Sequence, residues 1–370
     1  MQVLVTGSKG FIGKNLIYRL KENKEYVINE FSKEHNLADL KDFIESSDFI
    51  IHLAGVNRPK ENKEFQRSNV DLTNDLCGIV RKSNKKIPIV YASSTQASLE
   101  NHYGNSKSKA EKLLLELQKD IRNPIFIYRY PGVFGKWSKP NYNSVVATFC
   151  HNVANDLEIN ISDETAQIEL VYIDDLVDDL LDLLSDTNRQ KNDGYVPVNF
   201  SYKVKLGEIA KSINLFKESR SNLKTEEVGT GFLRALYSTY ISFLPKEMFS
   251  YDLNPHADER GLFSEVLRTK RSGQFSFFTA KPGVTRGVHY HHSKTEKFLV
   301  IKGKALFKFR NLITDEKHEL VTSEKKLQIV ESIPGWVHSI TNIGEDDMYT
   351  MLWANETFNP ENPDTITSEI

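Results

Sequence analysis

The sequence is poor in cysteine and has no long apolar run. Its 370 residues include only Cys77 and Cys150, which excludes a disulfide framework and a zinc cage built from cysteines. No apolar run approaches the roughly 20 residues that a membrane-spanning helix needs. The opening MQVLVTG is β-rich and lacks the basic and apolar segments of a leader peptide. We therefore expect a cytoplasmic protein.

An excess of charge of one sign is also absent. Lys and Arg number 48 against 50 Asp and Glu, a formal net charge of -2. This balance argues against a general attraction to nucleic acid or to an anionic membrane, although a local basic pocket could still hold a nucleotide. The composition is that of a globular protein, with 39% hydrophobic and 26% charged residues. The length favours two domains.

Short β-rich runs alternate with helical patterns over the first two-thirds of the chain. One helical run, SKSKAEKLLLELQ, places Ala110, Leu113, Leu114 and Leu117 on one face. A further helix is predicted from about Asp174 to Leu184. The predicted strands are Gln2 to Thr6, Tyr26 to Phe31, Asp48 to Leu53, Pro88 to Ala92 and Ile125 to Tyr130. The alternation predicts an α/β, Rossmann-like, doubly wound parallel sheet.

The pattern changes near Pro245 to Asn254. From about residue 200 to 245 it is helical, and we interpret this stretch as the outer cap of the first domain. Beyond it, short β-branched and aromatic runs alternate with Gly, Pro and Asn turns, which is typical of an all-β domain. The predicted domains are residues 1–247 and 248–370.

A glycine-rich turn, TGSKGFIG, follows the first predicted strand. Gly7, Gly10 and Gly13 stand before a helix, where such a turn lets the backbone approach a pyrophosphate. A plain strand–helix turn could have the same glycines. As a cofactor site, the motif comprises Gly7, Lys9, Gly10, Phe11, Ile12 and Gly13.

The end of the second strand bears on the choice of cofactor. The run INEFSKE has no Asp at the position that would hold an adenosine 2'-hydroxyl. Ser32 and Lys33 suit a 2'-phosphate better, so NADP(H) is predicted. Glu30 and Glu34 lie close by, and Lys33 could instead be a solvated side chain.

A YxxxK pair follows the fourth predicted strand. Tyr103 and Lys107 are four residues apart at a helix start and therefore share a face. A nearby ammonium stabilises a tyrosinate, which allows the phenol to exchange a proton with a carbonyl or an alcohol. Ser94, in YASSTQA at the strand end, would place a hydroxyl beside the same carbonyl. These three residues are the predicted catalytic set, and Tyr103 and Lys107 are also expected to contact the nicotinamide cofactor.

Residues 1 to about 245 resemble the extended short-chain dehydrogenase/reductase family, which acts mostly on nucleotide sugars. TGSKGFIG, DFIIHLAG, the Asn69–Val70 pair, YASS, YGNSK, RYPGVFG and VYIDDLV carry the resemblance. It implies catalysis by Ser94, Tyr103 and Lys107, and a cofactor contact at Leu53, Ala54 and Gly55. Gly132 stands where the family often has Asn, which puts one substrate contact in doubt.

A metal site is predicted in the last third of the chain. His289 and His291 alternate on a predicted strand, so both imidazoles face one side of the sheet. Glu296 follows, and His338 comes after the Pro334–Gly335 turn. Three nitrogens and one oxygen favour Zn, with Fe, Ni or Mn as alternatives. His292 and His318 are predicted to be surface residues.

Both segments, GVTRGVHYHHSKTEKFLVIKG and PGWVHSITN, resemble the two motifs of the cupin superfamily, which implies a barrel. DERGLFSE (Asp258, Arg260, Gly261, Phe263, Glu265) and TRGVHYH resemble the branch of cupins that epimerises nucleotide 4-keto-6-deoxy sugars. In that branch the His of this stretch acts as base without metal, whereas here His289 is an expected ligand. Another group must then move the proton, and the sequence does not choose among candidates such as Lys297.

The whole chain is similar to bifunctional enzymes of capsular polysaccharide synthesis that fuse these two domains. The stretches NRPKENKEF, FGKWSKPNYNSVVATFC, KFLVIKG and NETFNPENPDT carry that likeness. It implies epimerisation at carbon 3 and NADPH reduction at carbon 4 of a UDP-2-acetamido-2,6-dideoxy-4-hexulose. The product would be UDP-N-acetyl-L-pneumosamine, the L-talo sugar on the path to UDP-N-acetyl-L-fucosamine. A homodimer is also implied. Asn57, Arg58, Lys136 and Asn141 are candidate substrate contacts by their position after strand ends.

Two alternatives stay open at this point. The barrel could be a non-catalytic, metal-stiffened module for binding or dimerisation, attached to a simple nucleotide-sugar 4-ketoreductase. The reductase could instead be an inactive NADP sensor, although Ser94, Tyr103 and Lys107 argue against that.

Overall fold

The chain forms two compact units in the computed structural model. The structure describes residues 1–83, 85–187, 193–253, 256–258, 261–263, 267, 273–356 and 361–370. One unit comprises Met1–Phe134 with Ile168–Lys203, and the other comprises Gly135–Gln167 with Val204–Ile370. The compact units therefore do not follow the boundary predicted at residue 247. Residues 204–247, expected as a cap of the first domain, group with the β-rich part of the chain.

The first unit is built on a six-stranded sheet. Its order is β2-β1-β3-β4-β5-β8, and every neighbouring pair is parallel. The strands are β1 (Gln2–Thr6), β2 (Val27–Phe31), β3 (Phe49–His52), β4 (Ile89–Ser94), β5 (Ile125–Tyr130) and β8 (Tyr195–Val196). The predicted α/β doubly wound class is confirmed, and β1 and β5 have the bounds predicted for them.

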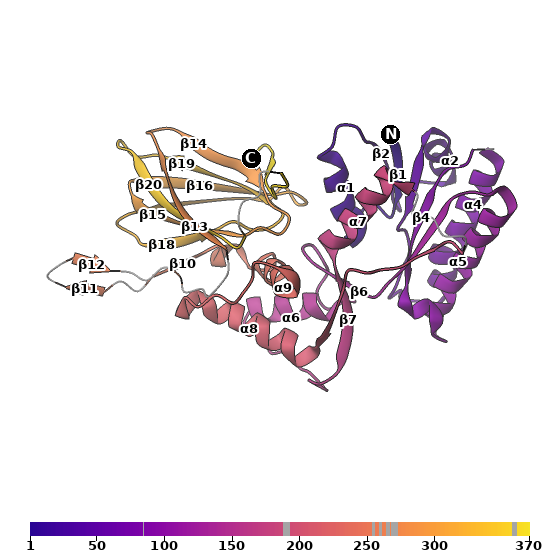
Figure 1. The fold of residues 1–370 in the computed structure, drawn as a ribbon, viewed down its shortest axis with the longest axis horizontal. Helices are drawn as coiled ribbons and strands as arrows, with labels where there is room; N and C mark the ends of the chain where they lie inside the picture. The colour runs from indigo at the N-terminus through magenta and orange to yellow at the C-terminus, as the bar shows by residue number, and fades with distance from the viewer. Residues whose placement is uncertain are drawn as a thin grey trace. The chain divides into compact units, whose positions relative to one another are not determined.

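Helices cover both faces of this sheet (Figure 1): α1 and α7 lie on one side, and α2, α4 and α5 on the other. Their bounds are α1 (Phe11–Lys21), α2 (Leu37–Ser46), α3 (Lys63–Phe65), α4 (Leu72–Ser83), α5 (His102–Ile121) and α7 (Ile173–Ser185). A π-helical turn spans Gln66–Asp71 and a 3-10 turn spans Thr95–Ser98. The predicted stripe of α5 faces the core, since Ala110, Leu114 and Leu117 are fully buried and Leu113 packs beside them. Each buried leucine contributes about 1.5–3 kcal/mol to stability.

The second unit combines three helices with a β-barrel. The helices are α6 (Val145–Ala154), α8 (Leu206–Asn222) and α9 (Gly231–Ile241), and Phe216 and Tyr237 join the last two with ring centroids 5.0 Å apart. The helical pattern read from about residue 200 is found, except that Ser201–Lys205 is a strand, β9. β9 forms a small sheet with β6 (Gly132–Phe134) and β7 (Gln167–Tyr172). The chain passes from one unit to the other within or next to these three strands.

The barrel consists of two five-stranded antiparallel sheets, ordered β10-β18-β15-β20-β13 and β17-β16-β19-β14-β21. Phe298 on β15 and Phe307 on β16 bring the sheets together, with ring centroids 5.6 Å apart. The bounds are β10 (Ser250–Asp252), β13 (Gln274–Ala280), β14 (Thr285–Tyr290), β15 (Glu296–Lys302), β16 (Lys304–Asn311), β17 (Lys317–Ser323), β18 (Gln328–Glu331), β19 (Trp336–Asn342), β20 (Met348–Ala354) and β21 (Ile366–Thr367). A hairpin of β11 (His256–Asp258) and β12 (Gly261–Phe263) lies between β10 and β13 in the chain, and a 3-10 turn spans Lys246–Met248. The expected all-β C-terminal architecture is confirmed.

A buried ionic cluster fastens α8 to the barrel. Glu331 on β18 pairs with Arg220 from α8 and with Lys297 from β15, and all three side chains are less than 10% exposed. Lys297 also donates to the Tyr251 hydroxyl at 3.1 Å. Breaking a buried pair by removing one partner leaves a charge uncompensated, so the cluster strongly favours this packing of helix on barrel.

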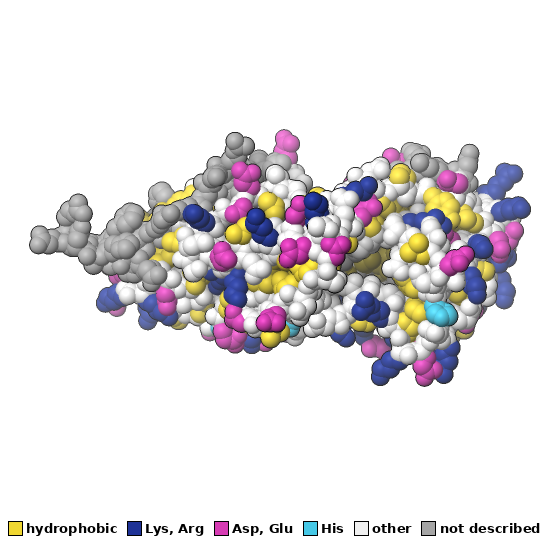
Figure 2. Space-filling model, turned by 90° about the horizontal axis from the view of Figure 1, so that it is seen from below, with side chains coloured by type: hydrophobic (Ala, Val, Ile, Leu, Met, Phe, Trp, Pro, Cys, Tyr) yellow, Lys and Arg dark blue, Asp and Glu magenta, His cyan; other side chains and the backbone are white. Residues whose placement is uncertain are grey.

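Charges of both signs are mixed on the surface shown in Figure 2. No described helix is long and apolar enough to span a bilayer. On the face shown in Figure 2, basic and acidic side chains are interspersed, in keeping with the net charge of -2. This mixture gives no continuous basic area on that face.

Gly104 allows α5 to pack against the turn that follows Ser94. A Cβ at position 104 would lie 2.1 Å from the Gln96 carbonyl oxygen and 2.6 Å from that of Leu99. We predict that Gly104→Ala lowers the free energy of unfolding of the first unit by about 1–3 kcal/mol, because backbone atoms must move.

Gly78, in the interior of α4, is the matched control because a Cβ there meets no atom of the described residues within 4 Å. Gly78→Ala should raise stability by about 0.5–1 kcal/mol through helix propensity. Urea denaturation followed by far-ultraviolet circular dichroism measures both. Equal effects of the two substitutions would contradict the packing described for Gly104.

Candidate active site and metal centre

The glycine turn contacts the segment that follows β3. Gly7 has a φ of +70°, and a Cβ there would lie 2.8 Å from the Ala54 Cα. Gly13 is equally constrained, since its Cβ would lie 2.3 Å from the Gly7 carbonyl oxygen. The structure thus brings together two of the predicted cofactor segments, the turn at 7–13 and Leu53–Gly55. Only glycine permits this approach at positions 7 and 13, so a generic strand–helix turn does not account for them.

His52, at the end of β3, is the centre of a buried hydrogen-bond chain. The Thr73 hydroxyl donates to the Asn69 carbonyl oxygen at 2.7 Å, so it accepts from His52 Nε2, 2.9 Å away. His52 Nδ1 then accepts from the Thr6 hydroxyl at 2.7 Å, and Thr6 accepts from the Ala54 amide. Burial lowers the pKa of His52 to about 3, so the ring is neutral. Sequence reasoning missed this role, although His52 stands in the HLAG motif.

Asn69 ties the same segment to α5. Its side chain accepts from the Val56 amide at 2.7 Å and donates to the Val56 carbonyl oxygen at 3.0 Å. It also donates to the Ser106 hydroxyl at 2.8 Å, and that hydroxyl donates to the Tyr103 carbonyl oxygen. The chain of bonds therefore runs from the end of β3 to the helix that has the YxxxK pair.

Lys107 is buried beside the end of β4. Its ammonium donates to the Ala92 carbonyl oxygen at 2.7 Å and lies 4.7 Å from the centre of the Tyr91 ring. Burial lowers its pKa from 10.5 to about 8. A lysine with this pKa holds its proton at neutral pH, although the charged form is poorly solvated. Tyr103 is half-buried one turn earlier, with its ring 6.0 Å from that of Phe65.

The structure distinguishes between the two serines at the end of β4. Ser93 is buried and donates to the Glu111 carboxylate at 2.5 Å. Ser94 accepts from the Gln96 amide at 3.2 Å, which does not use its hydroxyl hydrogen. The Ser94 hydroxyl hydrogen is therefore free to donate a hydrogen bond, whereas Ser93 helps to hold α5 through Glu111. The catalytic role of Ser94 stays a prediction.

The predicted contacts to a 2'-phosphate lie in the loop after β2. Ser32 is buried, with its hydroxyl 3.3 Å from His35 Nδ1, and Lys33 is exposed. Lys9 of the glycine turn reaches this loop through an exposed ion pair with Glu34 at 2.5 Å. Lys9 of the glycine turn and Lys33 of the loop itself therefore both lie at this loop. The preference for NADP(H) stays a prediction.

The four candidate substrate contacts belong to different units. Asn57 and Arg58 follow β3 in the first unit, whereas Lys136 and Asn141 belong to the second. Lys136 is buried, with its ammonium 5.4 Å from the centre of the Trp137 ring. Their role as substrate contacts stays a prediction.

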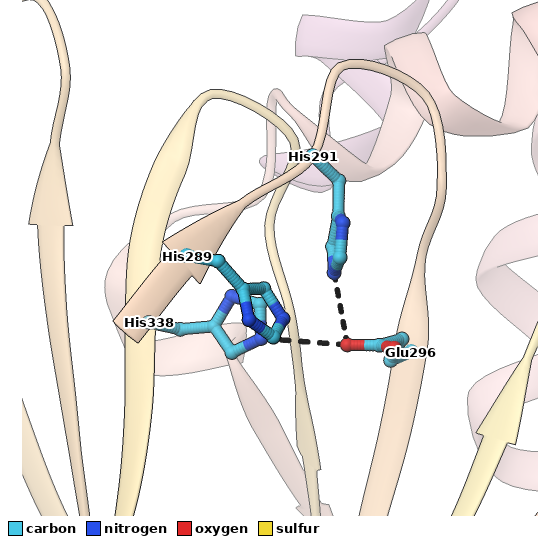
Figure 3. Close-up of side chains that lie close together, drawn as sticks. All are labelled: His289, His291, Glu296 and His338. Atoms are coloured by element: carbon cyan, nitrogen blue, oxygen red, sulfur yellow. Dashed lines mark hydrogen bonds and ion pairs between the residues drawn. The ribbon is translucent and has the colours of Figure 1, made fainter. Parts of the chain in front are cut away.

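The four predicted metal ligands converge inside the barrel (Figure 3). His289 comes from β14, His291 directly follows it, Glu296 begins β15 and His338 lies on β19. One potential ligand atom from each lies within 4.8 Å of all the others. The Glu296 carboxylate lies 2.9 Å from His291 Nε2 and 3.4 Å from His338 Nε2. Bonds of about 2.0–2.2 Å to a tetrahedral ion place ligand atoms roughly 3.3–3.6 Å apart, a spacing close to these.

The hydrogen bonding of this group is incomplete without a cation. His291 Nδ1 lies 2.5 Å from the Asp364 carbonyl oxygen, so this nitrogen carries a proton. Nε2 of the same ring lies 2.9 Å from the Glu296 carboxylate. Among the residues that the structure describes, His289 Nε2 and both ring nitrogens of His338 are buried and have no hydrogen-bond partner. Such an arrangement fits a divalent ion, and these four residues are the ones that would hold it.

Burial and mutual charge keep these groups in the forms that bind metals. Burial, reinforced by the other two imidazoles, lowers the pKa of His289 to about 3. Burial also lowers the pKa of His338. For Glu296, burial alone would raise the pKa, but the neighbouring His291 and His338 hold it well below the usual value. Neutral imidazoles and an ionised carboxylate are the ligand forms.

A bulge in β14 aims His289 at the site. The register with β19 shifts between Gly287 and His289, where Val288 has a φ of +59°. A β-branched residue rarely adopts this conformation, which costs about 1–3 kcal/mol. The bulge places His289 opposite His338, with ring centroids 4.8 Å apart. HxH spacing predicted the shared face, but the bulge was not predictable from it.

Two further expectations can be compared with the structure. His292, predicted at the surface, is buried with 4% exposure, and His318 is half-buried, so the prediction is wrong for His292. The cause is that the whole loop between His291 and Glu296 is covered. Asp258, Gly261 and Phe263 of the epimerase-like fragment lie on the β11–β12 hairpin, while Arg260 and Glu265 lie outside the described residues.

The depressed pKa of Lys107 predicts a pH dependence of cofactor binding. Lys107 is charged below about pH 8 and loses its proton above it, so the hydrogen bond predicted from its ammonium to the nicotinamide ribose should weaken as pH rises. We expect the affinity for the nicotinamide cofactor to fall about tenfold or more above this pH, the magnitude of a charged hydrogen bond.

Fluorescence titration of the reduced cofactor from pH 6 to 10 measures this effect. Lys107→Met should bind weakly throughout, without the pH-dependent loss. Lys109→Met is the matched control, because Lys109 is exposed on the same helix. A wild-type affinity that stays constant across pH 8 would contradict the assignment.

Comparison with known proteins agrees with this geometry in both parts of the chain. Residues 3–196 match the NAD dependent epimerase/dehydratase family, and residues 256–366 match the Polysaccharide biosynthesis C-terminal domain. The chain is 52% identical, over all of its length and 99% of the relative, to UDP-2-acetamido-2,6-beta-L-arabino-hexul-4-ose reductase of Pseudomonas aeruginosa.

Solved structures of a similar protein cover the same full length. The crystal structure of the capsular polysaccharide assembling protein CapF from Staphylococcus aureus is 42% identical over 100% of both chains, with a TM-score of 0.68. A structure of CapF with the inhibitor 3-isopropenyl-tropolone is 38% identical over 100% of both chains, with a TM-score of 0.64. The chain therefore belongs to the NAD dependent epimerase/dehydratase family, within the CapF-like group that joins such a domain to a polysaccharide biosynthesis C-terminal domain.

Proposed function

We propose that this protein converts a UDP-2-acetamido-2,6-dideoxy-4-hexulose in two steps, epimerisation at carbon 3 by the barrel and NADPH-dependent reduction at carbon 4 by the parallel-sheet domain. The product is UDP-N-acetyl-L-pneumosamine, the L-talo sugar. The observation that carries this proposal is the 52% sequence identity, over the full length of the chain, to a UDP-hexulose reductase. Cytoplasmic location and assembly as a homodimer are parts of it that only the likeness to related enzymes supports.

Three side chains perform the reduction in this proposal. When bound, NADPH supplies the hydride that adds to carbon 4. The Tyr103 hydroxyl donates its proton to the carbonyl oxygen, and Ser94 donates a hydrogen bond to the same oxygen. The Lys107 ammonium, buried under the end of β4, favours the tyrosinate left behind and holds the cofactor ribose. Ser32 and Lys33, with Lys9 nearby, are the groups proposed to contact the 2'-phosphate.

The barrel performs the epimerisation in this proposal. The ketone at carbon 4 acidifies the hydrogen at carbon 3, so a base removes that proton and an acid returns one to the opposite face. A divalent ion held by His289, His291, Glu296 and His338, with Zn the ion that the ligand types favour, would stabilise the negative charge on the carbonyl oxygen. Lys297 is excluded as the base, because its ammonium points away from Glu296 toward Glu331 and Tyr251.

Stereochemistry supports an inversion before the reduction. The Pseudomonas relative is named for an L-arabino 4-ketone. Reducing carbon 4 of such a ketone gives only the L-ido or the L-altro sugar, because carbon 3 keeps its configuration. Inversion at carbon 3 gives the L-lyxo ketone, and its reduction can give the L-talo sugar. An L-talo product therefore requires both steps if the substrate is the L-arabino ketone.

The inhibitor in one CapF structure adds support for a metal. That inhibitor is a tropolone, whose two adjacent oxygens suit a divalent cation. The imidazole and carboxylate groups inside the present barrel form the corresponding ligand set.

A simple reductase is the second candidate function. The Pseudomonas relative is named a reductase alone, which favours a barrel that serves for binding or dimerisation without catalysis. The two candidates differ in one observable, the exchange of the hydrogen at carbon 3 with solvent.

We predict that the protein exchanges this hydrogen in heavy water without NADPH. Proton magnetic resonance of a UDP-2-acetamido-2,6-dideoxy-4-hexulose follows the exchange as loss of the carbon 3 signal. A chelator should abolish it, and added Zn²⁺ should restore it. Glu296→Gln should slow it at least tenfold, because the carboxylate ligand is lost.

Glu319→Gln is the matched control, since Glu319 is an exposed residue on β17 that pairs with Lys308. It should leave exchange unchanged. If the wild-type protein catalyses no exchange yet consumes NADPH with the same sugar, the barrel is not an epimerase and the simple reductase is correct.

We further predict that Tyr103→Phe separates the two activities. Loss of the hydroxyl should slow NADPH oxidation by about 10²–10⁴-fold, the usual contribution of a general acid. Exchange at carbon 3 should persist at the wild-type rate. The absorbance of NADPH and the resonance assay, run on the same preparation, test both halves. Loss of exchange in this variant would mean that the parallel-sheet domain performs the epimerisation as well.

A further inference from the structure

We infer that Asp364, in the C-terminal segment, is a positioning residue for the metal centre. Its carboxylate organises the loop from His291 to Glu296, here called the metal loop, and its carbonyl oxygen orients the His291 ring. The inference rests on the proposed metal site and deepens it, because it adds a residue outside both recognised metal motifs.

Three successive backbone amides of the metal loop converge on the Asp364 side chain. The His292 amide donates to Oδ1 at 2.8 Å, and those of Ser293 and Lys294 donate to Oδ2, each at 2.7 Å. The Ser293 hydroxyl adds a fourth bond to Oδ2 at 3.1 Å. Consecutive amides that converge in this way form a concave anion site, which the carboxylate fills.

The metal loop depends on this anchor because it has no sheet of its own. Residues 291–296 are buried, and the segment between His291 and Glu296 belongs to no strand. Outside water, an amide without an acceptor is unfavourable, so the three amides need the carboxylate. The loop also has two of the four ligands, His291 and Glu296, at its ends. Fixing its middle therefore fixes the separation between His291 and Glu296.

The backbone of Asp364 acts directly on a ligand. Its carbonyl oxygen lies 2.5 Å from His291 Nδ1, which keeps the proton on that nitrogen and turns Nε2 toward Glu296. Thr365 continues the contact, since its hydroxyl accepts from the Lys294 ammonium at 2.6 Å. A hydrogen bond to the outer nitrogen of a ligating histidine sets its tautomer and ring orientation.

Asp364→Asn tests this role in the full-length protein. The amide keeps the size of the side chain but loses the charge, and its NH₂ group faces amide donors where an acceptor is needed. Zn²⁺ affinity is measured by competition with a chromophoric chelator, and the ligand field by the visible spectrum of the Co²⁺-substituted protein. We expect Zn²⁺ to bind about 10–100-fold more weakly, the usual effect of losing such a partner, and the Co²⁺ bands to shift.

Two further variants complete the test. Asp315→Asn, an exposed barrel carboxylate paired with Arg310, should match the wild type in both measurements. Asp364→Glu keeps the charge but displaces it, so it should weaken binding less than Asn does. If Asp364→Asn does not fold, the same two measurements are made on Asp364→Glu instead.

The outcomes separate this inference from the proposed function. A wild-type protein that binds no divalent metal contradicts the metal centre itself. Wild-type affinity and an unchanged Co²⁺ spectrum in both Asp364 variants contradict only the positioning role. A lower melting temperature alone, with affinity and spectrum preserved, would show that Asp364 stabilises the barrel without shaping the site.

Discussion

The need to neutralise charge inside the barrel governs the structure of the second unit. β15 begins with Glu296 and Lys297, two ionisable residues whose side chains point to opposite faces of the strand. On one face, Glu331 takes two cations, Arg220 and Lys297, and the cluster is complete within the protein. On the other face, Glu296 lies among His289, His291 and His338, and burial lowers the pKa of His289 to about 3 and also lowers that of His338. The Lys294 ammonium lies 3.6 Å from the same carboxylate, but ring nitrogens of His289 and His338 have no hydrogen-bond partner among the described residues. Such nitrogens beside a buried carboxylate are the physical reason for expecting a metal ion there.

A different constraint, close approach of backbone to backbone, shapes the first unit. Gly7 and Gly13 let the turn after β1 contact Ala54, and Gly104 lets α5 contact the turn after Ser94. Hydrogen bonds through His52 and Asn69 then join these contacts into one connected set. Backbone contacts therefore fix this network at both of its ends, at the glycine turn and at Gly104. They hold α5, and with it Tyr103 and Lys107, in place. Such pre-organisation suits the proposed reduction, in which the Tyr103 hydroxyl and the Lys107 ammonium are already in position when substrate binds.

How much could be predicted from the sequence depends on how far apart in the chain the interacting residues are. The stripe on α5, strand β1 and the HxH pair depend on spacing within one element, so periodicity identified them. His338 was found only because a second motif carries its own turn and strand. The contacts of Asp364 join positions about 70 residues apart, and no local pattern marks a single aspartate in a polar tail. Burial of His292 was missed for the same reason, because its cover comes from distant parts of the chain.

The boundary between the two family matches differs from the boundary between the two compact units. Contacts of particular side chains explain the difference. Trp137 belongs to the stretch matched by the epimerase/dehydratase family, yet its ring lies against Gly335, where a Cβ would come within 2.7 Å of a ring atom. Gly335 is in the turn that leads into β19 and His338, and its amide donates to the His291 carbonyl oxygen. Arg220 and Arg234, from α8 and α9, likewise pair with Glu331 and Glu356 of the barrel. A barrel without these residues would leave Glu331 short of one cation and the metal turn without its cover. Trp137 therefore brings a residue of the epimerase/dehydratase match against the turn that leads into His338, whereas Arg220 and Arg234, which bind the barrel, lie between the two family matches.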